Sequence, residues 1–343
     1  MTTIRFAAIG LNHGHIYGQV NCLLEAGMEL AWVYAEEQDL IQEFLRQYPG
    51  TPVARSVDEI LDDKSIQVVT SASIPVDRAP LGIRVMQHGK DYLVDKPGFT
   101  TLEQLAEVRR VQAETKRVYS VFFSEHFAQR ATVKAGELVQ AGAIGRVIQT
   151  TGFGPHRMFG YSQQGRPDWF FHKRFFGGII NDIASHQIDQ FLFFTGSTEA
   201  EIVASQVANF NHPQYPDMDD YGDVLLRSPQ ATGYIRVDWF TPKGLSTWGD
   251  VRLFITGTDG YIELRKNCDI TGREGDNHLF LVDQKGMQYV PCNDVALPFG
   301  KQFVNDVLNR TETSMTQAHS FLASELALKA QQQATQFVPT ATT

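Results

Sequence analysis

Short apolar segments alternate with amphipathic segments through the first third of the chain. The apolar segments predict five strands, over residues 4–9, 29–34, 66–70, 92–94 and 119–122. The amphipathic segments predict helices, because their apolar residues recur at helical spacing, as at Leu40, Ile41, Phe44 and Leu45. One helix should begin at Thr100 or Thr101, where Glu103 or Gln104 completes a capping box. Strands alternating with helices form a parallel sheet. We therefore expect an α/β chain whose residues 1–122 form a doubly wound Rossmann domain.

The pattern changes from Ser124 onward. A helix should end at Gly142, and a strand should begin at Val147. Alternating segments then predict strands over residues 202–207, 221–226, 232–239, 251–256, 261–264 and 279–282, and a last helix over residues 318–336. We expect residues 123–343 to form an α+β domain with a large, open, mostly antiparallel sheet, suited to substrate binding and oligomerisation.

Composition agrees with two globular domains. The chain has 343 residues, of which 43% are hydrophobic and 20% charged. A formal net charge of −9 argues against nucleic acid and anionic membranes as main partners. No apolar run approaches the roughly 20 residues of a membrane span, and the first residues lead straight into a strand, so we expect a cytoplasmic protein. Cys22, Cys268 and Cys292 include no C-x-x-C pair, which indicates neither a disulfide framework nor a cysteine zinc site.

The turn after the first strand is a candidate dinucleotide site. Such a turn uses glycines at the positions of Gly10, Asn12 and His15, and only the first is present. Asn12 tolerates left-handed backbone angles, and Gly14 could relieve the turn one place early. Two interpretations stay open, a phosphate site at the helix N-terminus and a strand-to-helix turn without a ligand.

The end of the second predicted strand bears on the choice of cofactor. Ala35 occupies the position where an acid would bind the adenosine ribose, and Glu36 and Glu37 follow it. Acids without a nearby Arg or Lys repel a 2′-phosphate, which favours NAD over NADP. Glu36 could also be a solvated loop acid, so NADP stays open.

Two further motifs carry candidate chemistry. The strand before Asp95-Lys96-Pro97 delivers this triplet to the edge where open α/β sheets bind ligands, although a surface lysine is the alternative. Asp182 and His186 lie four residues apart, on one helical face, where a carboxylate can orient an imidazole that acts as a base. The alternatives are a capping Asp182 and a core His186.

At these motifs the sequence resembles the glucose-fructose oxidoreductase, inositol dehydrogenase and MocA (Gfo/Idh/MocA) family. That family carries Glu-Lys-Pro where this chain has Asp95, and a third glycine where it has Ile179. The resemblance also covers Ser73 and Pro75, at the turn under the nicotinamide ribose, with Arg78 in place of the usual His.

The resemblance implies three sets of site residues. Catalysis would use Lys96, which contacts the substrate oxygen, together with Asp182 and His186. Cofactor contacts would come from Gly10, Leu11, Asn12, His13, Glu36, Ser73, Pro75, Lys96 and Pro97. Substrate contacts would come from Lys96, Trp169, His172, Asp182 and His186, although the stretch with Trp169 and His172 could instead pack at a domain interface. Glu125 and His126 either lie near the cleft or cap a helix. His13 and His15 form an H-x-H pair, but no third ligand is evident, so we expect no metal.

The implied function is NAD(P)-dependent transfer of hydride between a sugar or polyol hydroxyl and a nicotinamide cofactor, with the substrate between the domains. The family also implies a homodimer or homotetramer through the second sheet. Two alternatives stay open. One is a hydrolase, lyase or epimerase that uses tightly bound NAD without net oxidation, and the other is a non-catalytic protein that binds a dinucleotide or sugar.

Overall fold

The computed structural model describes residues 3–159 and 166–339. The chain divides into two compact units, one of Met1–Phe122 with Pro298–Phe321 and one of Phe123–Leu297 with Leu322–Thr343. The segment Pro298–Phe321 therefore lies with the first unit, whereas the sequence placed it in the second. A contact with the first unit accounts for this assignment. Arg310 donates two hydrogen bonds, of 2.6 and 2.8 Å, to the carboxylate of Asp91, which belongs to the first unit.

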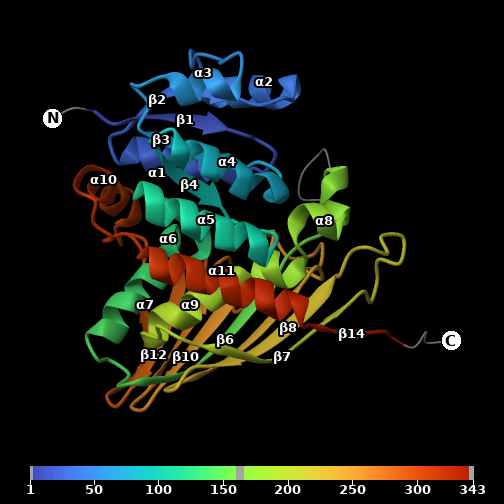
Figure 1. Ribbon diagram of the computed structural model, residues 1–343. Coiled ribbons are helices and arrows are strands. Elements are labelled where there is room, and N and C mark those ends of the chain that lie inside the picture. The colour runs from blue at the N-terminus through green and yellow to red at the C-terminus, as the bar shows by residue number, and fades with distance from the viewer. Residues whose placement is uncertain (1–2, 160–165, 340–343) are drawn as a thin grey trace. The chain divides into compact units, whose positions relative to one another are not determined.

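The first unit contains a five-stranded parallel sheet in the order β2-β1-β3-β4-β5 (Figure 1). The strands are β1 (Arg5–Ile9), β2 (Glu29–Tyr34), β3 (Val68–Ser71), β4 (Asp91–Asp95) and β5 (Tyr119–Phe122). The helices are α1 (His15–Glu25), α2 (Gln38–Gln47), α3 (Val57–Asp62), α4 (Pro75–Gln87), α5 (Leu102–Thr115) and α10 (Phe299–Asn309). The predicted Rossmann fold is confirmed. Both threonines serve the start of α5, because Thr101 accepts a hydrogen bond from the Gln104 amide and the Gln104 side chain accepts one from the Thr100 amide.

The second unit is built on a nine-stranded sheet in the order β13-β12-β11-β10-β6-β9-β8-β7-β14. The strands are β6 (Val147–Pro155), β7 (Glu201–Ala208), β8 (Tyr221–Arg227), β9 (Thr232–Asp238), β10 (Arg252–Gly257), β11 (Tyr261–Arg265), β12 (His278–Asp283), β13 (Gly286–Val290) and β14 (Thr335–Phe337). All neighbours are antiparallel except β6 with β9 and β7 with β14. The predicted open, mostly antiparallel sheet is confirmed.

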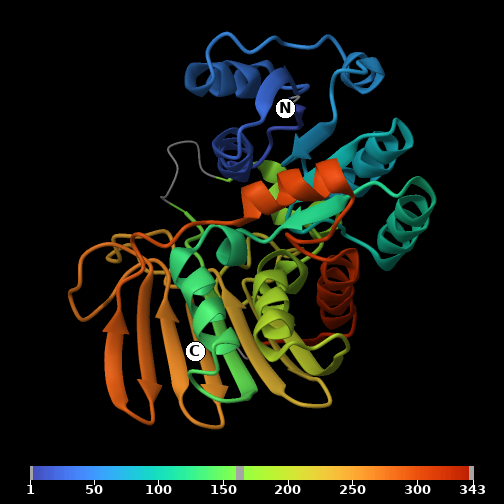
Figure 2. The same ribbon diagram turned by 90° about the vertical axis from the view of Figure 1, so that its left-hand side faces the viewer.

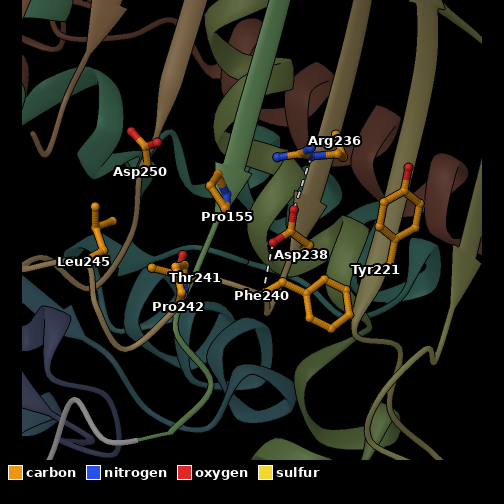
Figure 3. Close-up of a pocket in the computed structure, with 9 residues that line it drawn as sticks. All are labelled: Pro155, Tyr221, Arg236, Asp238, Phe240, Thr241, Pro242, Leu245 and Asp250. Atoms are coloured by element: carbon orange, nitrogen blue, oxygen red, sulfur yellow. Dashed lines mark hydrogen bonds and ion pairs between the residues drawn. The ribbon is translucent and has the colours of Figure 1, made fainter. Parts of the chain in front are cut away.

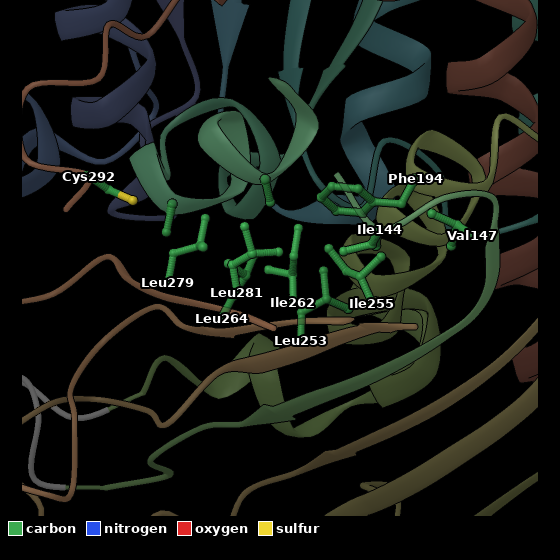
Figure 4. Packing of buried hydrophobic residues seen from close by; sticks show 12 residues of the cluster. Ile144, Val147, Phe194, Leu253, Ile255, Ile262, Leu264, Leu279, Leu281 and Cys292 are labelled. Atoms are coloured by element: carbon green, nitrogen blue, oxygen red, sulfur yellow. The ribbon is translucent and has the colours of Figure 1, made fainter. Parts of the chain in front are cut away.

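Helices α7 (Arg130–Gln140) and α9 (Ser185–Thr195) pack against one face of this sheet and contribute to its core. The unit also contains α6 (Ser124–Phe127) and α8 (Lys173–Phe176), and α11 (Gln317–Gln332) enters the unit at Leu322. Figure 2 shows α7 (green) and α9 (yellow-green) against the strands. Alternate residues such as Leu253, Ile255, Ile262 and Leu264 point into one buried apolar cluster (Figure 4). The period of two along each strand therefore separates a buried face from one that no helix of the described residues of this unit covers.

Two local predictions were wrong at the C-terminal end. The last helix ends at Gln332, and residues 335–337, which the sequence assigned to it, form β14. Strand β13 is also absent from the predicted set. Both segments are half-buried or exposed, so they lack the apolar alternation that predicts a strand, and pairing with β7 and β12 makes them extended. Among the described residues, no helix is long and apolar enough to cross a membrane.

Two helical glycines in the first unit should respond oppositely to the same substitution. A Cβ on buried Gly82 in α4 would lie 2.5 Å from Tyr119 and 2.7 Å from Tyr92, whereas one on Gly18 in α1 meets nothing within 4 Å. We expect Gly82→Ala to destabilise the protein by about 1–3 kcal/mol through overpacking. Gly18→Ala should stabilise it by about 0.5–1 kcal/mol through helix propensity. Urea unfolding midpoints measure both, and shifts of the same sign would contradict the packing described for α4.

Candidate active site

The first unit places the predicted cofactor residues along the carboxyl ends of β1 and β3. Gly10 has a φ of +78°, and a Cβ there would lie 2.5 Å from the Ser73 Cβ. The turn is fixed at both sides, because the Gly10 amide donates to the Tyr34 carbonyl at 2.9 Å and the His13 amide donates to the Ala72 carbonyl at 2.9 Å. The turn therefore requires a glycine at position 10 both for its backbone angle and for its close approach to Ser73.

The rest of this turn closes without left-handed residues. Neither Asn12 nor Gly14 has a positive φ, so neither of the two compensations suggested by the sequence is used. Asn12 instead donates from its side chain to Glu37 at 2.7 Å. Leu11 is buried beneath the turn. Gly10 is thus the one residue from 10 to 15 that needs a glycine for its backbone conformation.

Acidic side chains border the turn. Glu36 is exposed beyond the end of β2, and Pro75 forms the first turn of α4. Burial raises the pKa of Asp77 in that same helical turn, and the charge of Glu36 raises it further. Glu36 and Asp77 are therefore close enough to interact, and with Glu37 they make this edge electronegative.

A buried arginine fixes the Asp95-Lys96-Pro97 triplet. The Arg78 guanidinium donates to the carbonyls of Ser73, Asp95, Lys96 and Pro97 at 2.6–3.2 Å and to the Asp95 carboxylate at 3.1 Å. Arg78 is 1% exposed, and the Lys96–Pro97 peptide bond is cis. Lys96 itself is only 4% exposed. It is therefore not the surface lysine that the sequence left as an alternative.

The Asp95 carboxylate also contacts the H-x-H pair. His15 Nδ1 lies 2.9 Å from Asp95 Oδ1, His13 Nδ1 lies 3.7 Å from Asp95 Oδ2, and the ring centroids of the two histidines are 4.1 Å apart. Burial would raise the pKa of Asp95, but His15 and Arg78 outweigh it and hold the pKa well below its usual range. The pair thus has a nearby third group with a ligand atom, which the sequence could not show because it lies 80 residues away.

In the second unit, two glycines and a glutamine position the helix that carries Asp182 and His186. Gly177 and Gly178 have φ values of +86° and +92°. The Gln331 side chain of α11 accepts a hydrogen bond of 2.8 Å from the Ile180 amide at the start of this helix. A Cβ on Gly178 would lie 2.3 Å from Gln331, so the glycine makes room for the cap.

The helix begins with a π-helical turn, Ile180–Ala184, and continues as α9. Asp182 is 8% exposed and His186 is 2% exposed. Asp182 lies inside the first turn, so it is not the residue that caps the helix. A wider π turn changes which residues align along a helix, and such turns often occur at functional sites.

Arg166 is a neighbour of Asp182 that the sequence did not single out. Its guanidinium lies over the rings of Phe170 and Trp239, at 4.3 and 4.5 Å from their centroids, and these two rings contact each other. Burial lowers the pKa of Arg166 to about 10, while the charge of Asp182 opposes this shift.

The predicted sugar-lining residues lie in a more exposed segment. Trp169, in the short helix η1 (Asp168–Phe171), is partly buried and packs against Phe170. His172 precedes α8, with its ring 3.5 Å from Asp168 and 3.9 Å from Asp217. Its side chain is 40% exposed.

A second buried polar cluster supports α9 from below. Lys266 is 1% exposed and donates to the backbone and side chain of Glu125 at 3.0 and 3.3 Å and to Gln190 at 2.5 Å. Gln187 of α9 also donates to Glu125, at 2.8 Å. Burial lowers the pKa of Lys266, and Glu125 opposes that shift. Glu125 therefore serves as the carboxylate partner of a buried lysine.

A cavity of about 380 Å³ lies elsewhere in the second unit, at the ends of β6, β8 and β9 (Figure 3). Its polar lining includes Arg236 and Asp238, whose side chains form an ion pair at 3.2 Å. It includes none of the predicted site residues, so its shape says nothing about the chemistry of Lys96 or His186.

A parallel Rossmann unit joined to a unit with a large, mostly antiparallel sheet is the fold of an NAD-binding oxidoreductase, and the family models agree. Residues 4–123 match the family model described as "Oxidoreductase family, NAD-binding Rossmann fold". Residues 132–263 match the model of the GFO/IDH/MocA C-terminal domain. The chain belongs to the Gfo/Idh/MocA oxidoreductase family.

Several relatives share most of their length with this chain. A crystal structure from Erwinia carotovora atroseptica SCRI1043 is 49% identical, covers 97% of this chain and 99% of its own, and superposes with a TM-score of 0.94. The scyllo-inositol 2-dehydrogenase (NAD(+)) of Bacillus subtilis (strain 168) is 24% identical over 83% of this chain and 79% of its own. A levoglucosan dehydrogenase structure is 17% identical, covers 96% of this chain and 96% of its own, and superposes with a TM-score of 0.77.

The free energy of unfolding should fall as the pH is lowered, because His13 in the turn after β1 resists protonation in the folded protein. Burial lowers the pKa of His13 well below its ordinary value, and the charge of His15 adds to this. Below about pH 6.5 the unfolded chain binds a proton at His13 that the folded chain does not, so acidification favours unfolding. The free energy of unfolding should fall more steeply between about pH 6.5 and pH 5 in the wild type than in His13→Gln. Urea unfolding across this range measures the difference, and parallel pH profiles would argue against a His13 that stays neutral in the folded protein.

Proposed function

We propose that this protein is an NAD-dependent dehydrogenase that acts on a hydroxyl group of a sugar or polyol. The observation that carries the proposal is the fixed position of Lys96. Its backbone is clamped by Arg78 at the carboxyl end of β4, where Rossmann sheets bind their ligands. A buried ammonium at that edge can stabilise negative charge that develops on a substrate oxygen.

The second unit supplies a base. In the proposed mechanism His186 removes the proton of the substrate hydroxyl, Asp182 orients or tunes the His186 imidazole, and Lys96 stabilises the oxygen. The nicotinamide cofactor supplies the two-electron acceptor when it is bound. The proposed substrate contacts of Trp169 and His172 concern recognition of the sugar and not proton transfer.

The substrate class rests on the relatives. Relatives named scyllo-inositol 2-dehydrogenase (NAD(+)), D-xylose dehydrogenase and levoglucosan dehydrogenase match 83%, 43% and 56% of this chain. The levoglucosan dehydrogenase structure is a complex with NADH and levoglucosan. Each name belongs to a distant relative, so the proposal for this chain extends to the class of polyhydroxylated substrate and not to one sugar.

We also propose that the chain forms a homodimer or homotetramer through the sheet face that the unit's helices leave uncovered. Phe153 of β6, Phe254 of β10 and Leu225 of β8 lie at the alternate positions that face away from the core. Leu225 is 42% exposed. Burying such apolar side chains against a second copy would be favourable.

Loss of either proposed catalytic group should reduce turnover while the fold stays intact. We expect Lys96→Ala and His186→Gln each to lower kcat by about 10²–10⁴ in a screen of sugars and polyols with NAD. If both groups act on one hydroxyl, the double variant should lose less than the product of the single losses.

Lys301→Ala, on the exposed surface of α10, is the control and should retain full activity. Full turnover by Lys96→Ala, with an unchanged circular dichroism spectrum, would remove Lys96 from the mechanism. Product formation by the wild type without net reduction of added NAD would favour the alternative of a tightly bound cofactor that cycles.

The acidic edge of the cofactor turn should select NAD over NADP. The exposed Glu36 carboxylate, close to Asp77, would repel the 2′-phosphate. Calorimetric titration of the stripped protein should show tighter binding of NAD than of NADP, and Glu36→Gln should narrow the ratio of the two affinities by about tenfold. Glu43→Gln on α2 is the matched control and should leave the ratio unchanged. A wild type that prefers NADP would contradict this assignment.

A further inference from the structure

Three side chains with metal-binding atoms meet at the carboxyl ends of β1 and β4. One ligand atom each from His13, His15 and Asp95 lies within 4.8 Å of the other two. The residues come from the turn after β1, the first position of α1 and the last position of β4. A pair of histidines that lacked a third ligand in the sequence thus gains one through the parallel sheet.

The backbone that carries these ligands is well fixed. The amide of His13 is bonded to the Ala72 carbonyl at 2.9 Å, beyond the end of β3. Arg78 holds Asp95 Oδ2 at 3.1 Å, and Oδ1 faces His15 at 2.9 Å. Ligands on rigid elements, with a second residue that orients the carboxylate, are the arrangement that metal sites require.

We propose that His13, His15 and Asp95 form a binding site for a divalent transition-metal ion such as Zn²⁺. Two imidazoles and one carboxylate are a donor set that binds Zn²⁺ or Fe²⁺ and leaves coordination positions open for water or a small ligand. Mg²⁺ and Ca²⁺ are less suitable, because they prefer a shell of oxygen atoms. The inference does not depend on the proposed dehydrogenase activity.

Small side-chain movements would bring the ligands to bonding distance. Ligand atoms around a tetrahedral zinc ion are about 3.4 Å apart, given bonds of about 2.0–2.1 Å. His15 Nδ1 lies 2.9 Å from Asp95 Oδ1 and His13 Nδ1 lies 3.7 Å from Asp95 Oδ2, and a set of one ligand atom per residue lies within 4.8 Å. The side chains of His13 and His15 are 26% and 37% exposed, which leaves both imidazoles room to rotate while Asp95 stays fixed.

The surrounding charges set the expected strength. Arg78 and Lys96 both act electrostatically on this cluster, and both would repel a cation. They oppose the attraction of the Asp95 carboxylate, so the site should bind more weakly than a structural zinc site. We expect micromolar affinity, with one ion per chain.

The test uses the full-length, untagged protein without cofactor. Calorimetric titration with Zn²⁺ measures affinity and stoichiometry, and titration with Co²⁺ gives a visible absorption band that reports nitrogen ligands. We expect His13→Gln and His15→Gln each to weaken binding of Zn²⁺ by at least about 100-fold. His88→Gln is the matched control, because His88 also faces an acid, Asp62 at 4.0 Å, with a similar exposed fraction of 35%.

Each outcome decides the proposal. One Zn²⁺ per chain, lost in both site variants and retained in His88→Gln, supports it. Absence of binding by the wild type at submillimolar Zn²⁺, or equal binding by all four proteins, overturns it. Circular dichroism of each variant excludes unfolding as the cause of a loss. These titrations contain no NAD, so a failure to bind Zn²⁺ would not contradict the proposed dehydrogenase function. Conversely, a separate finding that the protein does not bind NAD would not contradict the metal site.

Discussion

The candidate chemistry of the first unit depends on one buried guanidinium. Arg78 joins the end of β3, through the Ser73 carbonyl, to the triplet that follows β4. A charged group removed from water is costly unless its donors are satisfied, and Arg78 meets this condition with four carbonyls and the Asp95 carboxylate. Removing one partner of such a pair typically costs about 3–5 kcal/mol, because the other charge stays buried without compensation. The position of Lys96 is therefore tied to the stability of the fold.

In the second unit, too, hydrogen bonds from buried polar side chains fix the element that carries the proposed catalytic residues. Gln331, near the end of α11, satisfies the amide of Ile180, a donor that the start of a helix leaves open. Lys266 then donates both to Glu125 and to Gln190 of α9. Asp182 and His186 thus lie on a helix that is fixed at its start and supported along its buried face. Side chains that touch no substrate determine where the proposed base stands.

Local patterns predicted the fold well, and distant contacts account for what they missed. Strand periodicity and the capping box at Thr101 depend on neighbours in sequence, so the Rossmann unit and most strands of the second sheet could be inferred. Helix α10 shows the limit, since its apolar face indicates burial but does not say in which unit. The candidate site shows the same division between local patterns and distant contacts. Sequence motifs singled out Lys96, Asp182 and His186. They did not single out Arg166 or Gln331, whose places depend on residues distant in sequence. No local signal marks an arginine for packing against two aromatic rings or a glutamine for capping a helix 151 residues away.

The sequence departs from the family pattern at His15 and at Asp95, and these two side chains contact each other. The third glycine of a dinucleotide turn permits close packing of helix and strand, and His15 replaces it with a large side chain. Asp95 replaces the glutamate of the family triplet with a carboxylate that is one methylene shorter. In this structure the two residues contact each other, with His15 Nδ1 2.9 Å from Asp95 Oδ1. The turn closes with Gly10 as the single residue among positions 10–15 that has a positive φ, so a glycine-poor sequence retains the Rossmann geometry.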